Sequence, residues 1–331
     1  MENKQKYSEL FAELRNILIE KKLIGADWKY GVAMLTLAGG LYLLGVFLMP
    51  IFGPVLTIFY FSLLFVEMGY ISHDIIHNQY FQSVNANRAI AMFYANMGIG
   101  LSSSWWIDKH NVGHHNSTNS NIHDTDIRDY DEIFTGRVGK HPIFHRYKKV
   151  LFWMAPVFVY FNLLIESYKF LFRKKYFGEM VMNLLFLFFP ILLIYQFGII
   201  GGAIVFLSIG AIVGIILGYV FMVNHIGLEV IDGLHIRDYA WLDLQTRTSR
   251  NISGTRLTTE IFWGLDKQIE HHLFPQISRR KIRKVAEIVK DFCKKNNLPY
   301  HEVSFSNWLQ EIYQTLSTGE VLNLVKGREL S

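Results

Sequence analysis

Gln268-Ile269-Glu270-His271-His272, followed by Leu273-Phe274-Pro275, is the stretch around which the rest of this sequence is organised. Two adjacent histidines with a glutamine three residues ahead form a group of potential metal ligands. Two further groups share this chemistry, His73-Asp74-Ile75-Ile76-His77 and His110-Asn111-Val112-Gly113-His114-His115. Long apolar segments separate these groups along the chain, and the first group directly follows one of them, so the sequence predicts a metal site in a membrane protein.

The apolar segments are long enough to cross a bilayer. Hydrophobic residues make up 51% of the 331-residue chain, and 26 residues are phenylalanine. A helix of about 20 apolar residues crosses the ~30 Å hydrocarbon core. Such segments predict four transmembrane helices in two hairpins, over residues 30–49, 51–70, 180–197 and 199–223. Shorter apolar stretches at 89–101 and 150–165 contain polar residues and are expected to form interfacial or re-entrant helices.

The charged residues indicate how these helices are oriented. All 33 lysines and arginines fall in residues 1–29, 70–178 and 224–331, and so do all 13 histidines. With four crossings these segments share one face, which the positive-inside rule makes cytoplasmic. The active site and both termini are therefore expected in the cytoplasm, at a bacterial inner membrane or the endoplasmic reticulum. The net charge of +5 is assigned to the membrane surface, because no nucleic-acid-binding motif accompanies it.

The spacing of the histidines predicts two metals. His73 and His77 are four residues apart, so both project from one face of a helix. His110 and His114 also share a face, whereas His115 is rotated by about 100° and can reach a second metal. The seven histidines of the three groups are more than one ion with open positions can use. A zinc hydrolase, which needs three protein ligands, would leave most of them unexplained.

The three groups, in this order and between apolar spans, resemble the histidine boxes of the membrane fatty acid desaturases. Gln268 in the third box is similar to the front-end branch of that family, which includes the Δ5, Δ6 and sphingolipid Δ8 enzymes. The resemblance covers residues 30–305. It implies an all-α membrane protein whose cytosolic helical cap holds a histidine-rich di-iron site, and whose function is O₂-dependent insertion of a cis double bond into a fatty acyl chain. An acyl hydroxylase or acetylenase on the same scaffold is the alternative, and a histidine-rich metal transporter or receptor is a more distant one.

The resemblance also implies which residues form the site. The expected iron ligands are the box histidines and one histidine between the second and third boxes: His73, His77, His110, His114, His115, His225, His271 and His272. A histidine just outside a span is otherwise an interfacial side chain, which is the alternative for His225. Residues expected to ligate a metal or to contact a ligand are Gln268, Asp124, Asp126 and Asn224. Residues 241–251, WLDLQTRTSRN, resemble the family's segment before the third box, and spacing assigns them no role.

Three segments are expected along the chain. Residues 1–29 form an amphipathic cytosolic segment, which either lies on the bilayer or packs on the soluble cap. Residues 30–305 form the membrane desaturase domain, and residues 306–331 a C-terminal cytosolic helix and tail. The single cysteine, Cys293, excludes an intramolecular disulfide framework.

The expected partners are the membrane, a fatty acyl substrate and an external electron donor. The acyl chain is carried on CoA, an acyl-carrier protein or a lipid. Front-end relatives often carry a fused cytochrome b5 domain with a His-Pro-Gly-Gly motif, and here the one His-Pro pair, His141-Pro142, is followed by Ile143. A separate ferredoxin or cytochrome b5 is therefore expected. The basic run from Arg279 to Lys284 serves either such an acidic carrier or anionic headgroups.

Overall fold

The computed structural model describes residues 2–126 and 142–318. The chain forms two compact units. We call residues 26–108 and 154–219 the membrane unit, and residues 1–25, 109–153 and 220–331 the polar unit. The chain therefore passes from one unit to the other four times.

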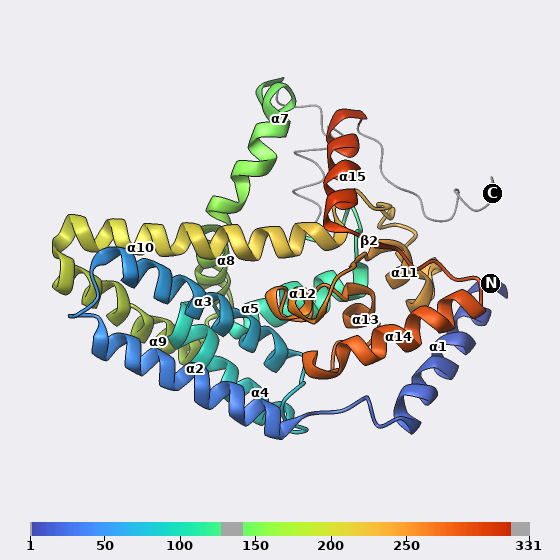
Figure 1. Ribbon diagram of the computed structural model, residues 1–331, viewed down its shortest axis with the longest axis horizontal. Helices are drawn as coiled ribbons and strands as arrows, with labels where there is room; N and C mark the ends of the chain where they lie inside the picture. The colour runs from blue at the N-terminus through green and yellow to red at the C-terminus, as the bar shows by residue number, and fades with distance from the viewer. Residues whose placement is uncertain (1, 127–141, 319–331) are drawn as a thin grey trace. The chain divides into compact units, whose positions relative to one another are not determined.

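The membrane unit begins with a helical hairpin. α2 (Trp28–Leu48) starts after Asp27, whose carboxylate accepts a hydrogen bond from the Tyr30 N–H at 3.3 Å. Pro54 opens α3 (Pro54–Ile76) at a position where a proline sacrifices no helical hydrogen bond. A Cβ added to Gly45 of α2 would collide with the ring of Tyr60 in α3. The two helices therefore pack closely side by side (Figure 1).

A buried polar network joins the other helices of the membrane unit. The Glu179 carboxylate accepts hydrogen bonds from the Asn96 amide at 2.9 Å and from the Ser102 hydroxyl at 2.6 Å. Asn183 accepts a further bond from Asn96 at 2.7 Å. This network fixes the loop between η1 and α5. The remaining elements of the unit are α4 (Val84–Ala91), η1 (Met92–Met97), α5 (Ser103–Trp106), η4 (Ala155–Phe158), α8 (Val159–Lys174), α9 (Phe177–Phe186) and most of α10 (Phe188–His225).

The chain reverses direction at Gly198. This residue has φ 74° and ψ 169°, a conformation open to glycine, and it interrupts the helical geometry of α10. Figure 1 shows α9 and the first part of α10 running one way and the rest of α10 running back. A Cβ at Gly202 would lie 2.6 Å from the backbone of Ile194, so the two arms touch. The two helices predicted at residues 180–197 and 199–223 therefore form the arms of a hairpin, one on each side of this glycine.

Four helical stretches are long and apolar enough to cross a membrane, by length and composition: Trp28–Leu48, Pro54–Ile76, Lys149–Lys174 and Phe177–His225. The predicted class, an all-α membrane protein, is confirmed. The third stretch contains residues 150–165, for which interfacial or re-entrant helices were predicted. Here α7 (Pro142–Met154), η4 and α8 follow one another without a break, and the stretch reaches 26 residues. Polar Ser167 within it is buried and accepts a hydrogen bond from Ser102 N at 2.6 Å.

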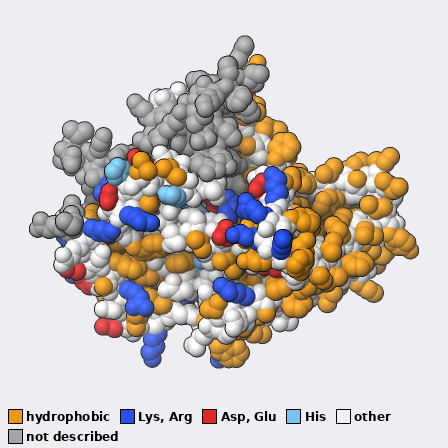
Figure 2. Space-filling view, turned by 180° about the vertical axis from the view of Figure 1, so that it is seen from behind, with side chains coloured by type: hydrophobic (Ala, Val, Ile, Leu, Met, Phe, Trp, Pro, Cys, Tyr) orange, Lys and Arg blue, Asp and Glu red, His pale blue; other side chains and the backbone are white. Residues whose placement is uncertain are grey.

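The surface of the membrane unit is largely apolar. Leu43, Phe47, Ile51, Ile199 and Ile200 are each between 71% and 78% exposed. Figure 2 shows side chains of this kind as the broad orange region at the right. Apolar patches of this extent on a protein surface mark contact with a membrane or a partner. Together with the apolar helices, they agree with insertion of this unit into lipid.

The close contact at Gly202 yields a prediction. Gly202→Ala is expected to destabilise the hairpin by about 1 to 3 kcal/mol, because the new methyl group must push apart two packed backbone segments. Gly40→Ala is the matched control, since Gly40 lies in α2 with nothing within 4 Å of its added Cβ. The measurement is the thermal melting temperature of each purified variant in one detergent. Equal melting temperatures for the two variants would contradict the hairpin.

The polar unit has a hydrophobic core of its own. Leu14 and Leu18 of α1 (Glu2–Glu20) are fully buried with Ile269, Val285 and Val289 from later helices. The rings of Phe11 and Phe274 stack with centroids 5.2 Å apart. Of the two positions predicted for the N-terminal amphipathic helix, the structure shows packing on the protein's own core. The bilayer position is wrong for Leu14 and Leu18, because this core already covers them.

Most elements of the polar unit are short. The longest that lie wholly in this unit are α1, α14 (Arg279–Lys295) and α15 (Phe305–Thr318), and α15 contains the described part of the predicted C-terminal segment. Two residues of β1 pair in parallel with two of β2. The elements after α1 are η2 (Ile107–His114), η3 (His115–Ser117), α7 (Pro142–Met154), η5 (Ile236–Asp238), α11 (Trp241–Thr248), β1 (Asn251–Ile252), α12 (Arg256–Ile261), α13 (Gln268–Leu273), α14 (Arg279–Lys295), β2 (Glu302–Val303) and α15 (Phe305–Thr318).

Candidate metal centre

Three histidines from three distant parts of the sequence converge in the polar unit. His114 ends η2, His225 ends α10 and His272 lies in α13. Their candidate ligand atoms all lie within 4.8 Å of one another, and all three side chains are buried. The ring centroids are 4.7 to 4.8 Å apart, and the rings are steeply inclined to each other. Such an arrangement points nitrogen atoms from three directions at one centre.

In each of the three rings Nδ1, which we call the outer nitrogen, faces a hydrogen-bond acceptor. His114 Nδ1 lies 2.8 Å from the Asp124 carboxylate, His225 Nδ1 lies 2.9 Å from the Thr248 carbonyl, and His272 Nδ1 lies 2.9 Å from Gln245 Oε1. A proton held at Nδ1 leaves the lone pair on Nε2. Nε2 of His272 is buried without a hydrogen-bond partner among the described residues. A histidine that binds a metal through one ring nitrogen usually donates a hydrogen bond from the other. The residues present therefore fit a bound metal ion.

Burial and neighbouring charges shift the pKa values of His272 and His114 in opposite directions. Burial and the neighbouring rings of His225 and His114 lower the pKa of His272 well below its usual range, so this imidazole is neutral. Burial also opposes the charged form of His114, but the adjacent Asp124 carboxylate outweighs that cost and raises the pKa of His114. A metal ion would replace the proton that Asp124 attracts to this ring.

The second histidine box folds differently from the prediction. Residues 107–114 form a π-helix, and His115 begins a 3-10 turn, whereas the sequence suggested one regular α-helix. The change brings His110 and His115 together, with their Nε2 atoms 3.2 Å apart. Rings of His110 and His114 are 5.2 Å apart. π-helical turns are frequent at functional sites because they alter which side chains share a face.

A second set of nitrogens in the polar unit comprises His110, His115 and His271. The His115 and His271 rings lie 5.0 Å apart, and those of His110 and His271 lie 6.4 Å apart. Asp126 lies 3.5 Å from His110 Nδ1 and also pairs with Lys109. Burial alone would raise the pKa of Asp126, but Lys109, His110 and His114 hold it well below its usual range. Asp126 is therefore an anion that faces the second box.

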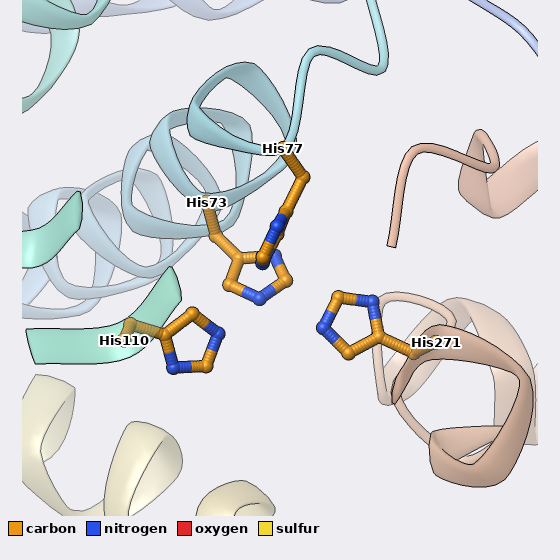
Figure 3. A group of neighbouring side chains, drawn as sticks. All are labelled: His73, His77, His110 and His271. Atoms are coloured by element: carbon orange, nitrogen blue, oxygen red, sulfur yellow. The ribbon is translucent and has the colours of Figure 1, made fainter. Parts of the chain in front are cut away.

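The first box belongs to the membrane unit. His73 lies in the last turns of α3 and His77 caps that helix, and their ring centroids are 4.6 Å apart. Figure 3 shows the two rings at the end of α3, and it also labels His110 and His271 of the polar unit. The prediction that His73 and His77 project together from one helix is confirmed.

Four further residues were predicted near the metals, and the structure places them differently. Asp124 contacts His114, and Asp126 contacts His110. The Gln268 amide nitrogen lies 3.0 Å from His225 Nε2. Asn224 instead donates to the Val220 carbonyl of its own helix at 2.9 Å. Its amide oxygen is buried without a hydrogen-bond partner among the described residues, so a role beside the metals stays a prediction for Asn224.

Two residues that contact the expected ligands were not predicted. Gln245 and Thr248 both lie in α11, within the stretch WLDLQTRTSRN whose role could not be assigned. A backbone carbonyl and an amide side chain carry no signature of a metal site. The resemblance of that stretch to the segment before the third box is the one signal that could have singled them out.

Comparison with known proteins decides the family. Residues 45–304 match the model of the fatty acid desaturase family. The chain belongs to the fatty acid desaturase family. The prediction from the histidine boxes is therefore confirmed, and the converging rings belong to the segment that matches this family.

Individual desaturases show modest similarity. The chain is 27% identical over 272 residues to Delta(8)-fatty-acid desaturase 2 of Arabidopsis thaliana, covering 74% of this chain and 59% of the relative. It is 27% identical to the acyl-lipid (9-3)-desaturase of Physcomitrium patens, covering 77% and 51%. It is 26% identical to the Delta(6)-fatty-acid desaturase fat-3 of Caenorhabditis elegans, covering 72% and 58%. The chain thus spans between half and three fifths of these relatives, whose names agree with the predicted front-end branch.

The contact between Asp124 and His114 yields a prediction. Asp124→Asn is expected to weaken metal binding by about 10- to 100-fold, because the ligand loses its charged acceptor. Asp238→Asn is the control, since Asp238 also contacts a histidine, His235, but on an exposed surface. The measurement is metal bound per chain in a titration with Co²⁺. Equal affinities for the two variants would contradict the role of Asp124.

Proposed function

We propose that this desaturase family member introduces a cis double bond into a fatty acyl chain at a centre of two iron ions. The observation that carries the proposal is the convergence of His114, His225 and His272, each with its outer nitrogen already hydrogen-bonded. The names of similar proteins support a front-end position for the double bond. No feature of the described residues favours a hydroxylase, an acetylenase or a transporter.

The ligand count supports two metals. His114, His225 and His272 would hold one ion. His110, His115 and His271 of the polar unit would hold the other, and His73 and His77 of the membrane unit are further candidate ligands. All eight are imidazoles, which suit iron among other metals. Bound there, iron would supply the reaction with O₂ that removes hydrogen from unactivated C–H bonds, which no side chain can do.

The chain's own residues would then position and protect the centre. Asp124, Thr248 and Gln245 keep three imidazoles in the tautomer that ligates. Burial of these rings excludes bulk water. In the overall reaction, a –CH₂–CH₂– unit, one O₂, two electrons and two protons give –CH=CH– and two waters. Neither the acyl chain nor O₂ supplies these two added electrons, so the protein must receive both from a separate electron donor.

We propose a reduced ferredoxin or cytochrome b5 as the source of those electrons. Arg280 and Lys284 are exposed on α14, which follows the third box by six residues. Oxygen consumption by the purified, iron-loaded chain should require both acyl substrate and reduced carrier, and it should fall as salt rises. Consumption with NAD(P)H alone would contradict the carrier. Unchanged rates after Arg280→Glu and Lys284→Glu would remove this docking site.

We also propose that the histidine-bearing segments and both termini face the cytoplasm, as the distribution of lysine and arginine supports. Single cysteines can test this in a Cys293→Ser background. Asn116→Cys lies at an exposed position directly after the second box, and Ile51→Cys lies at a 78% exposed position between α2 and α3. Impermeant thiol reagents added outside intact cells should label position 51 and leave position 116 unlabelled. Labelling of position 116 from outside would contradict the shared cytoplasmic face.

A further inference from the structure

The further inference concerns Gln245, a fully buried amide in the middle of α11. Its amide nitrogen donates to the backbone carbonyl of His115 at 2.8 Å. Its carbonyl oxygen accepts from the Thr118 hydroxyl at 2.9 Å and lies 2.9 Å from His272 Nδ1. One side chain outside the histidine boxes therefore contacts both the second and the third box.

These contacts fix the orientation of the amide. The His115 carbonyl can only accept a hydrogen bond, so the Gln245 atom that faces it must be the nitrogen. The oxygen must then face His272. An oxygen accepts and cannot donate, so His272 must carry its proton on Nδ1, and its lone pair lies on Nε2. The chain of contacts from His115 to Gln245 to His272 thus determines the tautomer of a predicted ligand.

The three acceptors also differ in charge. His114 faces the carboxylate of Asp124, while His225 faces a peptide carbonyl and His272 faces the neutral amide of Gln245. Gln245 and Thr248 both lie in α11, so this helix supplies two of the three acceptors, one a side-chain amide and the other a backbone carbonyl. α11 therefore contributes no ligand but orients two of them.

We propose that Gln245 is a positioning residue that holds His272 in its ligating tautomer and joins the second histidine box to the third. The proposal rests on the metal site of the proposed function. It assigns a role to the stretch WLDLQTRTSRN, which had none. Loss of the amide should weaken metal binding and alter the environment of the metal while the rest of the fold persists.

The test is a Co²⁺ titration of the metal-free full chain, followed by visible absorption. Gln245→Leu, of similar volume and without polar atoms, should bind Co²⁺ about 10- to 100-fold more weakly than the native chain. Gln245→Glu keeps an acceptor for His272 but offers no amide N–H to His115, so its affinity should lie between the two, with shifted absorption bands. Thr246→Val is the matched control, since Thr246 is also buried in α11 and its hydroxyl donates to carbonyls of the same helix.

Circular dichroism and melting temperature should match between the Gln245 variants and Thr246→Val. Native affinity and native absorption in Gln245→Leu would overturn the inference. Should Gln245→Leu fail to fold, native affinity with an unshifted spectrum in Gln245→Glu would overturn it equally. A native chain that binds no Co²⁺ would instead refute the proposed metal site itself, and this inference with it.

Discussion

Replacing His272 by Ala is expected to abolish desaturation and to remove metal from the purified protein. This ring is fully buried, its outer nitrogen is held by Gln245, and its inner nitrogen has no other partner among the described residues. In the proposed function two bound ions would supply the chemistry, so loss of one ligand should exceed a modest effect on rate. The measurements are iron per chain and the amount of unsaturated product. His114→Ala and His225→Ala should behave alike, because the three rings form one group.

The control for these variants is His235→Ala. His235 is 67% exposed and contacts Asp238 on the surface, so its loss should change neither iron content nor product. All variants should be recovered from the membrane fraction in similar amounts. Native iron content in two of the three ligand variants would refute the three-histidine site.

The second large effect is expected at Arg250, a guanidinium buried in the polar unit. Its Nη2 lies 3.2 Å from the Glu311 carboxylate, and its Nη1 donates to the carbonyls of Val223 and Ile226 at 3.1 and 3.3 Å. Those carbonyls flank His225 at the end of α10. Burial lowers the pKa of Arg250 to about 10, so the group remains charged at neutral pH. Arg250→Met should therefore destabilise the protein by about 3 to 5 kcal/mol, since it leaves a partly buried carboxylate and two carbonyls without this partner.

Arg256→Met is the matched control for Arg250→Met. Arg256 is 87% exposed and pairs with Glu260 one helical turn away, a contact that contributes about 0.5 kcal/mol or less. Arg250→Lys keeps the charge but not the planar fork, and its stability should fall between those of the native chain and Arg250→Met. Chemical denaturation in detergent measures all three. A stability of Arg250→Met equal to that of Arg256→Met would show that the buried pair does not anchor α10.

The fold class and the histidines of the site could be predicted because both have local signatures. A run of about 20 apolar residues is long enough to cross a bilayer and can be recognised directly in a sequence. His73 and His77 are paired by helical spacing alone. His225 is an isolated histidine at a helix end, and the family resemblance rather than its spacing singled it out.

The contacts that orient the ligands could not be predicted, because they depend on tertiary structure. Gln245 meets His115 and His272 across sequence separations of 130 and 27 residues. The π-helix of residues 107–114 has no sequence signature comparable to a cap or a proline. The apolar face of α1 suits a bilayer and a protein core equally well, and the buried partners of Leu14 and Leu18 decide between them.

The most direct test is the fatty acid composition of cells that express this chain, measured by gas chromatography and mass spectrometry. The account predicts a new fatty acid lighter than its parent by two hydrogen atoms, present with the native chain and absent with His272→Ala. A composition identical for the two, or a product heavier than its parent by one oxygen atom, would contradict it.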